Sequence, residues 1–172
     1  MFDEEKLASV LPGYVCAWSP CKSYRYTLWR VWDPGLPFVQ FIGLNPSTAD
    51  EKVSDPTVTR CINFAKAWEC GGMCMTNAFA LRDTDPKVML RADDPIGPEN
   101  NEWLRSIYDV TKYHVACWGA HGMHRLRHYV VVKMLKRLDC LKRTKGNLPS
   151  HPLYLRGDLR PTAYALRGEV LL

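Results

Sequence analysis

Apolar residues recur along this chain in two kinds of pattern, short continuous runs and longer stretches with helical spacing. Residues 38–44, Phe-Val-Gln-Phe-Ile-Gly-Leu, form a nearly continuous apolar run, which is typical of a strand buried on both faces. After Pro56 the apolar positions are spaced by three and four residues, which predicts an amphipathic helix ended by Gly71-Gly72. Its apolar face consists of Val58, Cys61, Ile62, Ala65 and Trp68.

The same patterns predict further strands and helices along the chain. Aromatic and β-branched residues indicate a hairpin near the N-terminus, and residues 82–99 form a long loop of the kind that often binds ligands. The expected strands are 14–18, 24–32, 38–44, 73–79, 114–118 and 139–141, and the later helices are 98–113 and 121–138. In the last helix, the residues expected to face the core are Leu126, Tyr129, Val130 and Met134.

This order of elements predicts the fold class. A hairpin followed by β-α-β-α-β-α-β is typical of an α/β three-layer sandwich with a central, mostly parallel sheet. The chain contains no repeat, linker or low-complexity tract. We therefore expect a single α/β domain over residues 1–172, with its core at about 14–157.

Composition narrows the class of protein. Apolar residues make up 47% of the 172 residues and charged residues 24%, as in ordinary globular proteins. The seven cysteines lack paired C-x-x-C spacing, which fits a reduced cytoplasmic protein better than a disulfide scaffold. Neither a signal peptide nor an apolar run of about 18 residues is present, so no membrane association is expected.

Charge is distributed unevenly along the chain. Residues 1–104 carry 10 basic and 14 acidic side chains, whereas residues 105–172 carry 13 basic and 4 acidic ones, a net charge of +9. An anionic partner would explain such a segment, and nucleic acid is the commonest. A solvated basic helix face would explain it equally well.

Four segments rich in polar side chains are expected at the carboxyl ends of the strands, where parallel sheets form their ligand sites. They are 43–50, Gly-Leu-Asn-Pro-Ser-Thr-Ala-Asp; 76–79, Thr-Asn-Ala-Phe; 117–121, Cys-Trp-Gly-Ala-His; and 149–153, Pro-Ser-His-Pro-Leu. All four could converge on one cleft.

The segment 43–50 carries the strongest signal. Gly43 allows the backbone to approach a ligand closely, and Asn45 can orient a water or a polar ring. Ser47 and Thr48 could hold a phosphate. A strand-to-helix turn capped by its polar residues is the alternative. The motifs G-x-x-x-x-G-K-[ST] and G-x-G-x-x-G are absent, which argues against nucleoside-triphosphate and dinucleotide binding.

Side chains that can read a base or move a proton belong to the same region. Asp50 and Asp55 are candidate general bases, although Asp55 could simply cap the following helix. Asn77 could read the edge of a nucleobase or satisfy loop backbone groups. His151 could donate to a leaving group or be an ordinary surface histidine.

Three histidines, His121, His124 and His128, would share one face of the helix expected at 121–138 and could form a metal site. No carboxylate or cysteine pair completes the set, and Arg125 and Arg127 would repel a cation. We therefore expect no metal and no other cofactor, and instead a basic helix facing phosphates.

Taken together, these motifs resemble a bacterial and phage family, domain of unknown function 1643. The resemblance covers roughly residues 16–157, and the family label implies no activity. It rests on the segment 43–50, Asp55-Pro56-Thr57, the segments 76–80 and 94–100, Trp118-Gly119 and His151-Pro152-Leu153-Tyr154.

More distantly, the loops are similar in order and type to those of the uracil-DNA glycosylase superfamily, which implies its fold. Gly43-Leu44-Asn45-Pro46 resembles its first motif, and Asn77 its base-reading residue. Trp118-Gly119 resembles one of its strand ends, and Ser150-His151-Pro152-Leu153 its late His-Pro-Ser-Pro loop. Leu153 stands where that loop has a serine.

This second resemblance implies a hydrolase of base excision, a DNA glycosylase that cleaves the N-glycosidic bond of a damaged or modified pyrimidine. Asn45, with Asp50 or Asp55, would hold the attacking water, and His151 would stabilise the leaving base. The residues around the base would be Gly43, Leu44, Pro46, Ser47, Thr48, Asn77, Phe79, Trp118 and Gly119. The phosphate contacts would be Arg125, Arg127, Lys145, Ser150 and Arg156.

We expect the protein to be a monomer that binds single- or double-stranded DNA. Two other classes stay open. One is a non-catalytic nucleic-acid or nucleotide-binding module, and the other is a hydrolase of free modified nucleotides.

Overall fold

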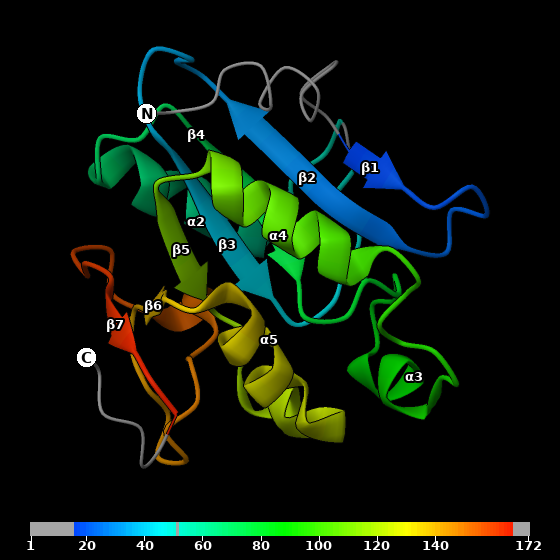
Figure 1. The fold of residues 1–172 in the computed structure, drawn as a ribbon. Helices are drawn as coiled ribbons and strands as arrows, with labels where there is room; N and C mark the ends of the chain where they lie inside the picture. The colour runs from blue at the N-terminus through cyan, green and yellow to red at the C-terminus, as the bar shows by residue number, and fades with distance from the viewer. Residues whose placement is uncertain (1–15, 51, 167–172) are drawn as a thin grey trace.

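A seven-stranded mixed sheet runs through the residues that the computed structural model describes, 16–50 and 52–166. Its strands are β1 Cys16–Trp18, β2 Arg25–Val31, β3 Phe38–Gly43, β4 Gly72–Asn77, β5 Tyr113–Ala116, β6 Leu138–Cys140 and β7 Thr162–Tyr164. The helices are α2 Pro56–Ala67, α3 Pro86–Arg91, α4 Asn100–Val110 and α5 Arg127–Leu135, with 3-10 helices η1 Ala120–Leu126 and η2 Pro152–Tyr154 (Figure 1).

The centre of the sheet is parallel and its edges are antiparallel. The strand order is β1-β2-β4-β3-β5-β6-β7, in which β3 pairs in parallel with both β4 and β5, and β5 with β6. The chain first adds β4 on one side of β3 and then β5 on the other. At such a reversal the loops leave neighbouring strands in opposite directions, which opens a crevice at their carboxyl ends.

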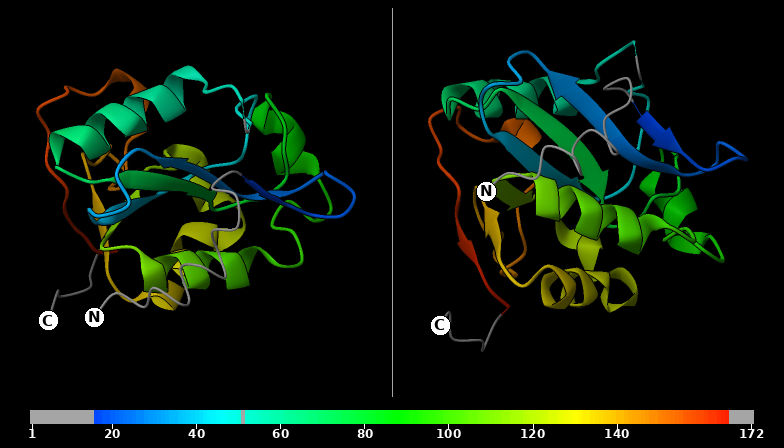
Figure 2. Two further views of the ribbon diagram at one scale, coloured as in Figure 1. Left: turned by 90° about the horizontal axis from the view of Figure 1, so that it is seen from above. Right: turned by 45° about the horizontal axis from the view of Figure 1, so that its top comes forward.

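Helices cover both faces of the sheet and complete the expected three layers. Figure 2 shows α2 on one face and α4 with α5 on the other. Successive side chains of β3 alternate between these layers, because strand residues point to opposite faces in turn. Phe41 packs in the cluster that contains Phe64 of α2, whereas Ile42 packs in the cluster that contains Leu104 and Val131 of α4 and α5.

The helix predicted after Pro56 is confirmed, but its C-terminal end is not where the glycines suggested. Asp55 caps the first turn by accepting a hydrogen bond from the Val58 amide at 2.8 Å. The helix ends at Ala67, and Glu69, with a φ of 60°, takes the left-handed conformation that a glycine usually supplies. Gly71 is required for another reason, since a Cβ there would lie 1.7 Å from the Asp33 carbonyl oxygen.

The single helix predicted at 121–138 is wrong. Residues 120–126 form a 3-10 helix that is broken at Arg125 and Leu126, where φ is 51° and 57°, and α5 begins only at Arg127. The break rotates the following residues, so the face predicted to be buried is largely exposed. Leu126, Tyr129 and Val130 are 66%, 49% and 42% exposed, and the residues that α5 buries are Arg127, Val131, Val132 and Leu135.

Two smaller differences lie later in the chain. The loop expected at 82–99 contains the short helix α3, which is capped by Asp85. The sheet also continues past residue 157 to β7, which pairs with β6 and was not predicted. Residues 14 and 15 of the first expected strand lie outside the described residues. Within the described part of the chain, no helix is long and apolar enough to cross a membrane.

Candidate functional site

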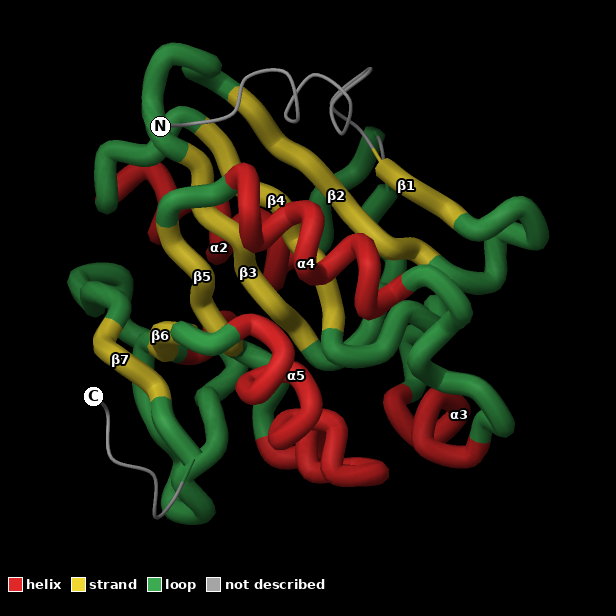
Figure 3. Tube along the Cα trace, in the orientation of Figure 1, coloured by secondary structure: helices red, strands yellow, loops and turns green. Residues whose placement is uncertain are grey.

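A cavity of about 430 Å³ opens at the carboxyl ends of β3, β4 and β5, beside the first turn of α2. Figure 3 shows that loops leave these strands at one end of the sheet. All four segments singled out in the sequence contribute to the wall, together with residues before and in α3. The volume falls within the range of small-molecule sites, about 300–1,000 Å³.

Most of the side chains predicted to form the site are brought together there. The predicted residues that line the cavity are Gly43, Leu44, Asn45, Ser47, Asp55, Asn77, Trp118, Gly119 and His151. Further wall residues, which the sequence did not single out, include Arg25, Met75, Asp83 and Thr84.

Of the residues predicted for catalysis or for contact with the base, four do not line the cavity: Pro46, Thr48, Asp50 and Phe79. The Asp50 carboxylate accepts the amides of Lys52 and Val53 at 2.8 and 2.9 Å, and these bonds lower its pKa. Because Asp50 lies outside the cavity wall and its lowered pKa makes it a weaker base, its predicted role as a general base is corrected. Phe79 is fully buried in the core beside α4 and α5, which corrects its predicted role against the base.

Asn77 is fixed by the backbone that carries it. The side chain of Asn100, itself fully buried, donates to the carbonyl oxygens of Asn77 and Ala78, both at 3.1 Å. Arg127 donates to the Ala78 carbonyl at 2.7 Å. Gly43 lies directly beside the amide, because a Cβ there would be 2.8 Å from Asn77 Oδ1. The end of β4 is therefore rigid before any ligand arrives.

His151 precedes η2 at the rim of the cavity, where its side chain stays exposed. Its Nδ1 accepts the Leu153 amide at 3.4 Å, so the proton of the neutral ring is assigned to Nε2. Surrounding protein atoms lower the pKa of His151 by desolvation, and the nearby Asp55 charge opposes this shift. At neutral pH the ring is thus a neutral donor through Nε2.

Asp55 is both a helix cap and a wall residue. Its Oδ1 is engaged by the Val58 amide. A carboxylate has two oxygens, which leaves Oδ2 as the atom able to accept a proton or orient a water. The two roles that the sequence suggested for Asp55, helix cap and general base, are therefore compatible.

Three arginines hold the loop that follows β3 by its carbonyl oxygens. Arg25 donates to Ala49, Arg30 to Asp50 and Arg82 to Ser47, the last two at 2.6 and 3.0 Å. Asn45 joins the loop to the opposite wall, since its Nδ2 donates to the Asp83 carbonyl at 2.9 Å. The loop is preorganised by contacts that replace regular secondary structure.

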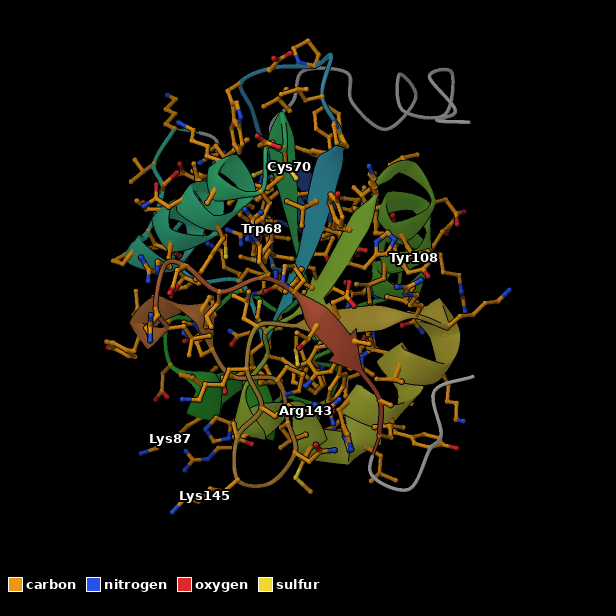
Figure 4. The ribbon with its side chains drawn as sticks, turned by 90° about the vertical axis from the view of Figure 1, so that its left-hand side faces the viewer. Trp68, Cys70, Lys87, Tyr108, Arg143 and Lys145 are labelled. Atoms are coloured by element: carbon orange, nitrogen blue, oxygen red, sulfur yellow. The ribbon has the colours of Figure 1, made fainter. Side chains whose placement is uncertain are left out.

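Two of the five predicted phosphate contacts, Arg125 and Arg127, are engaged within the protein. Arg127 is only 2% exposed, so its predicted role on phosphates is wrong. Arg125 donates to the carbonyls of Ala92 and Asp93, both at 2.8 Å, and Arg156 pairs with Asp158 at 2.5 Å. Lys145 projects outward from its loop (Figure 4).

The three histidines considered as a metal site do not share a helix face. His124 has non-helical backbone angles within η1, and its ring packs 5.8 Å from that of Phe79. Across residues 16–50 and 52–166, no group of three or more His, Cys, Asp or Glu is arranged to hold a metal ion.

Arg25, in the cavity wall, and Asn100, which holds the end of β4, are two residues to which the sequence gave no role. Arg25 stands at the start of a strand in which every residue from Arg25 to Trp29 is buried, and a charged residue in such a run is a recognisable signal. Asn100 belongs to a segment noted only for its resemblance, and its contact with the end of β4 depends on the tertiary fold.

The fold and the cavity define an α/β protein with a small-ligand pocket at the reversal point of a parallel sheet. Residues 25–153 match the sequence profile of a family described as Protein of unknown function (DUF1643), and the chain belongs to this family. Comparisons with curated proteins and with solved structures gave no match.

Proposed function

We propose that the protein hydrolyses the N-glycosidic bond of a damaged or modified base in DNA. One observation carries the proposal: Asp55, Asn77 and His151, from three separate segments, line one cavity of about 430 Å³. A proton acceptor, a carboxamide that can read a base edge and a neutral donor are the groups that such a reaction needs.

The chemistry follows from these groups. The bond between C1′ of the sugar and the base nitrogen breaks, and its electron pair leaves with the base. The water oxygen bonds to C1′, and its proton passes to Oδ2 of Asp55. Nε2–H of His151 donates to an oxygen of the base as negative charge develops there, which lowers the barrier electrostatically. The departing base then takes a proton from solvent.

The test is release of free base, detected by mass spectrometry, from DNA carrying uracil, mismatched or hypermodified pyrimidines. Asp55→Asn should reduce release at least 100-fold, since general bases contribute about 10²–10⁴ in rate. Asp85→Asn is the matched control, because Asp85 also caps a helix, α3, and does not line the cavity. Binding of DNA without release from any substrate would instead indicate a non-catalytic binding module.

One observation favours a second candidate, a hydrolase of free modified nucleotides. Arg125 and Arg127 bind backbone carbonyls within the protein, which leaves fewer cations for a DNA backbone than the sequence implied. Stronger competition by mononucleotides than by DNA of equal base content would support this candidate. A steep loss of affinity with salt would support DNA.

A further inference from the structure

A second cavity, of about 460 Å³, lies at the other end of β5 from the cavity described above. The first cavity contains Cys117 and Trp118, which follow β5, whereas the second contains Lys112, Tyr113 and His114, where β5 begins. The other wall residues of the second cavity are Tyr108, Arg137, Asp139, Pro161 and Ala163. The two cavities share no wall residue, so the second one is a separate site of small-molecule size.

The pairing of the strands places a carboxylate on the sheet face that borders the second cavity. Asp139 of β6 pairs with Val115 of β5 and with Ala163 of β7, so these three side chains point to the same face. Tyr113 precedes Val115 by two residues and shares that face. Because Ala163 carries only a methyl group, it leaves space beside the carboxylate of Asp139.

Asp139 has acceptor atoms that the protein leaves unused. Across residues 16–50 and 52–166, its carboxylate accepts no hydrogen bond and forms no ion pair. Burial raises the pKa of Asp139, and the charge of Arg137 opposes this shift. The side chain is nevertheless partly exposed and lines the cavity, so a ligand can reach it. Its two oxygens can accept two neighbouring N–H groups of one ligand.

His114 adds no positive charge to the second cavity. The Thr111 hydroxyl donates its one hydrogen to the Ile107 carbonyl at 2.7 Å, so the 3.2 Å contact with His114 Nδ1 assigns the ring proton to Nδ1. Burial lowers the pKa of His114 to about 4, which keeps the ring neutral at pH 7. The Tyr108 ring stacks on it at 3.8 Å and gives the cavity a flat aromatic wall.

The two cations of the second cavity are more exposed than its acceptors. Lys112 and Arg137 are exposed, whereas Asp139 and His114 are partly buried. Lys112 lies over the Tyr113 ring at 5.4 Å, and the charge of Arg137 acts on the pKa values of both Asp139 and His114. This arrangement suits a ligand with N–H donors at its inner end and a negative group at its outer end.

We propose that the second cavity binds a guanine nucleotide, with the base on Asp139 and the phosphate on Lys112 and Arg137. Guanine presents a ring N–H beside an amino group, a pair of donors that one carboxylate can accept. Adenine and cytosine present a ring acceptor beside their amino group, and uracil presents its N–H between two oxo groups. A guanidinium would bring the same donors, but its charge would be repelled by Lys112 and Arg137. The inference goes beyond the proposed function and does not depend on it.

The test of the base contact compares guanosine and inosine monophosphates, which differ only in the amino group. Isothermal titration of the full chain should give at least about tenfold tighter binding of the guanosine compound. Asp139→Asn replaces one acceptor oxygen by a donor, so this preference should fall below about twofold. Xanthosine monophosphate carries an oxo group in place of the amino group and should bind the variant at least about tenfold tighter than the wild type. Misfolding cannot imitate such a gain.

The control for this substitution is Asp93→Asn. Asp93 is exposed and lines neither cavity, so its loss should leave all three affinities unchanged.

The phosphate contact is tested separately. Arg137→Met should weaken guanosine monophosphate about fivefold or more, since hydrogen bonds to charged groups are the stronger ones, and should leave the affinity for guanosine unchanged. Lys136→Met is the matched control, because Lys136 is the exposed neighbour of Arg137 and lines neither cavity.

Three outcomes would overturn the inference: no binding of guanosine monophosphate at millimolar concentration, equal binding of the guanosine and inosine compounds, or an unchanged preference in Asp139→Asn. Guanosine monophosphate binding that is lost in Asp55→Asn and kept in Asp139→Asn would place the nucleotide in the first cavity and would also overturn it. Base release from DNA tests the proposed reaction alone, because that reaction uses no residue of the second cavity.

Discussion

Whether a single residue can act on a ligand depends on whether it lines the cavity and on which of its atoms already form hydrogen bonds. Asp50 and Asp55 lie five positions apart, and each accepts backbone amides through Oδ1, yet Asp50 does not line the cavity. Asp55 uses one oxygen for its helix and belongs to the wall. Sequence alone cannot separate two such residues, because the distinction lies in the path of the loop.

Gly43 leaves the space beside the Asn77 side chain that a larger residue would occupy. A Cβ in Gly43→Ala would lie 2.8 Å from Asn77 Oδ1, so the carboxamide must move. Because Asn77 is held by Asn100 through its backbone, the side chain has to rotate rather than shift with the strand. We expect affinity for uridine monophosphate to fall at least about tenfold, the loss of one good base contact, as measured by isothermal titration.

Gly146→Ala is the control for this substitution. The nearest atom to a Cβ there is Thr144 Oγ1 at 3.8 Å, an ordinary contact, and the residue does not line the cavity. Its affinity should match that of the wild type. Equal affinity in the Gly43→Ala protein would show that Asn77 does not contact the ligand.

At the scale of elements, the loop after β3 gains its order from arginine side chains. Arg82 donates to the carbonyls of Ser47 and Thr48 at 3.0 and 3.4 Å and stacks on Trp18 at 5.0 Å. In Arg82→Met these bonds are lost, so amides of residues 44–50 should exchange hydrogen about tenfold faster by mass spectrometry, while the sheet stays protected. Arg105→Met, on the exposed side of α4, should leave that exchange unchanged. Unchanged hydrogen exchange in Arg82→Met would mean that Arg25 and Arg30 are sufficient to keep the loop after β3 ordered.

The elements divide into those that the sequence determines locally and those that depend on distant contacts. The buried strand β3 and helix α2 were predicted because apolar periodicity and an Asp-Pro cap are local signals. The break within 121–138 was not predicted. It requires the left-handed backbone conformation at Arg125 and Leu126, and such residues rarely adopt it. Gly122, pressed against Trp118, and Arg125, bound to the carbonyls after α3, fix that break through tertiary contacts.

For the molecule as a whole, the order of the strands and helices indicated the place of the cavity more directly than the net charge did. The +9 of residues 105–172 suggested a phosphate-binding surface, but it counts Arg127, which is buried, and Arg125, which donates to backbone carbonyls of the protein. The place of the cavity, in contrast, followed from the order of strands and helices, since parallel strands bring their carboxyl ends together. Topology is therefore the more reliable guide to this site.

Stability of the whole fold should depend on histidines whose pKa values the surrounding protein lowers. The ring of His114 stacks 3.8 Å from that of Tyr108, and Thr111 Oγ1 lies 3.2 Å from its Nδ1. Burial lowers the pKa of His114 to about 4, with Asp109 opposing the shift and Arg137 adding to it. The pKa values of His128 and His151 are lowered as well. The folded state therefore binds fewer protons than the unfolded state at mildly acidic pH.

Because the unfolded chain protonates these histidines near pH 6.5 and the folded chain only at lower pH, the free energy of unfolding should fall as pH decreases from 6.5 toward 4. Above pH 7 it should be insensitive to them. Urea unfolding followed by tryptophan fluorescence should show a loss of about 1–2 kcal/mol between pH 7 and pH 5. His114→Gln, which cannot take up a proton, should lose less over the same interval, whatever its stability at pH 7. An equal loss in the variant would place the proton uptake on other groups and would mean that His114 titrates normally in the folded protein.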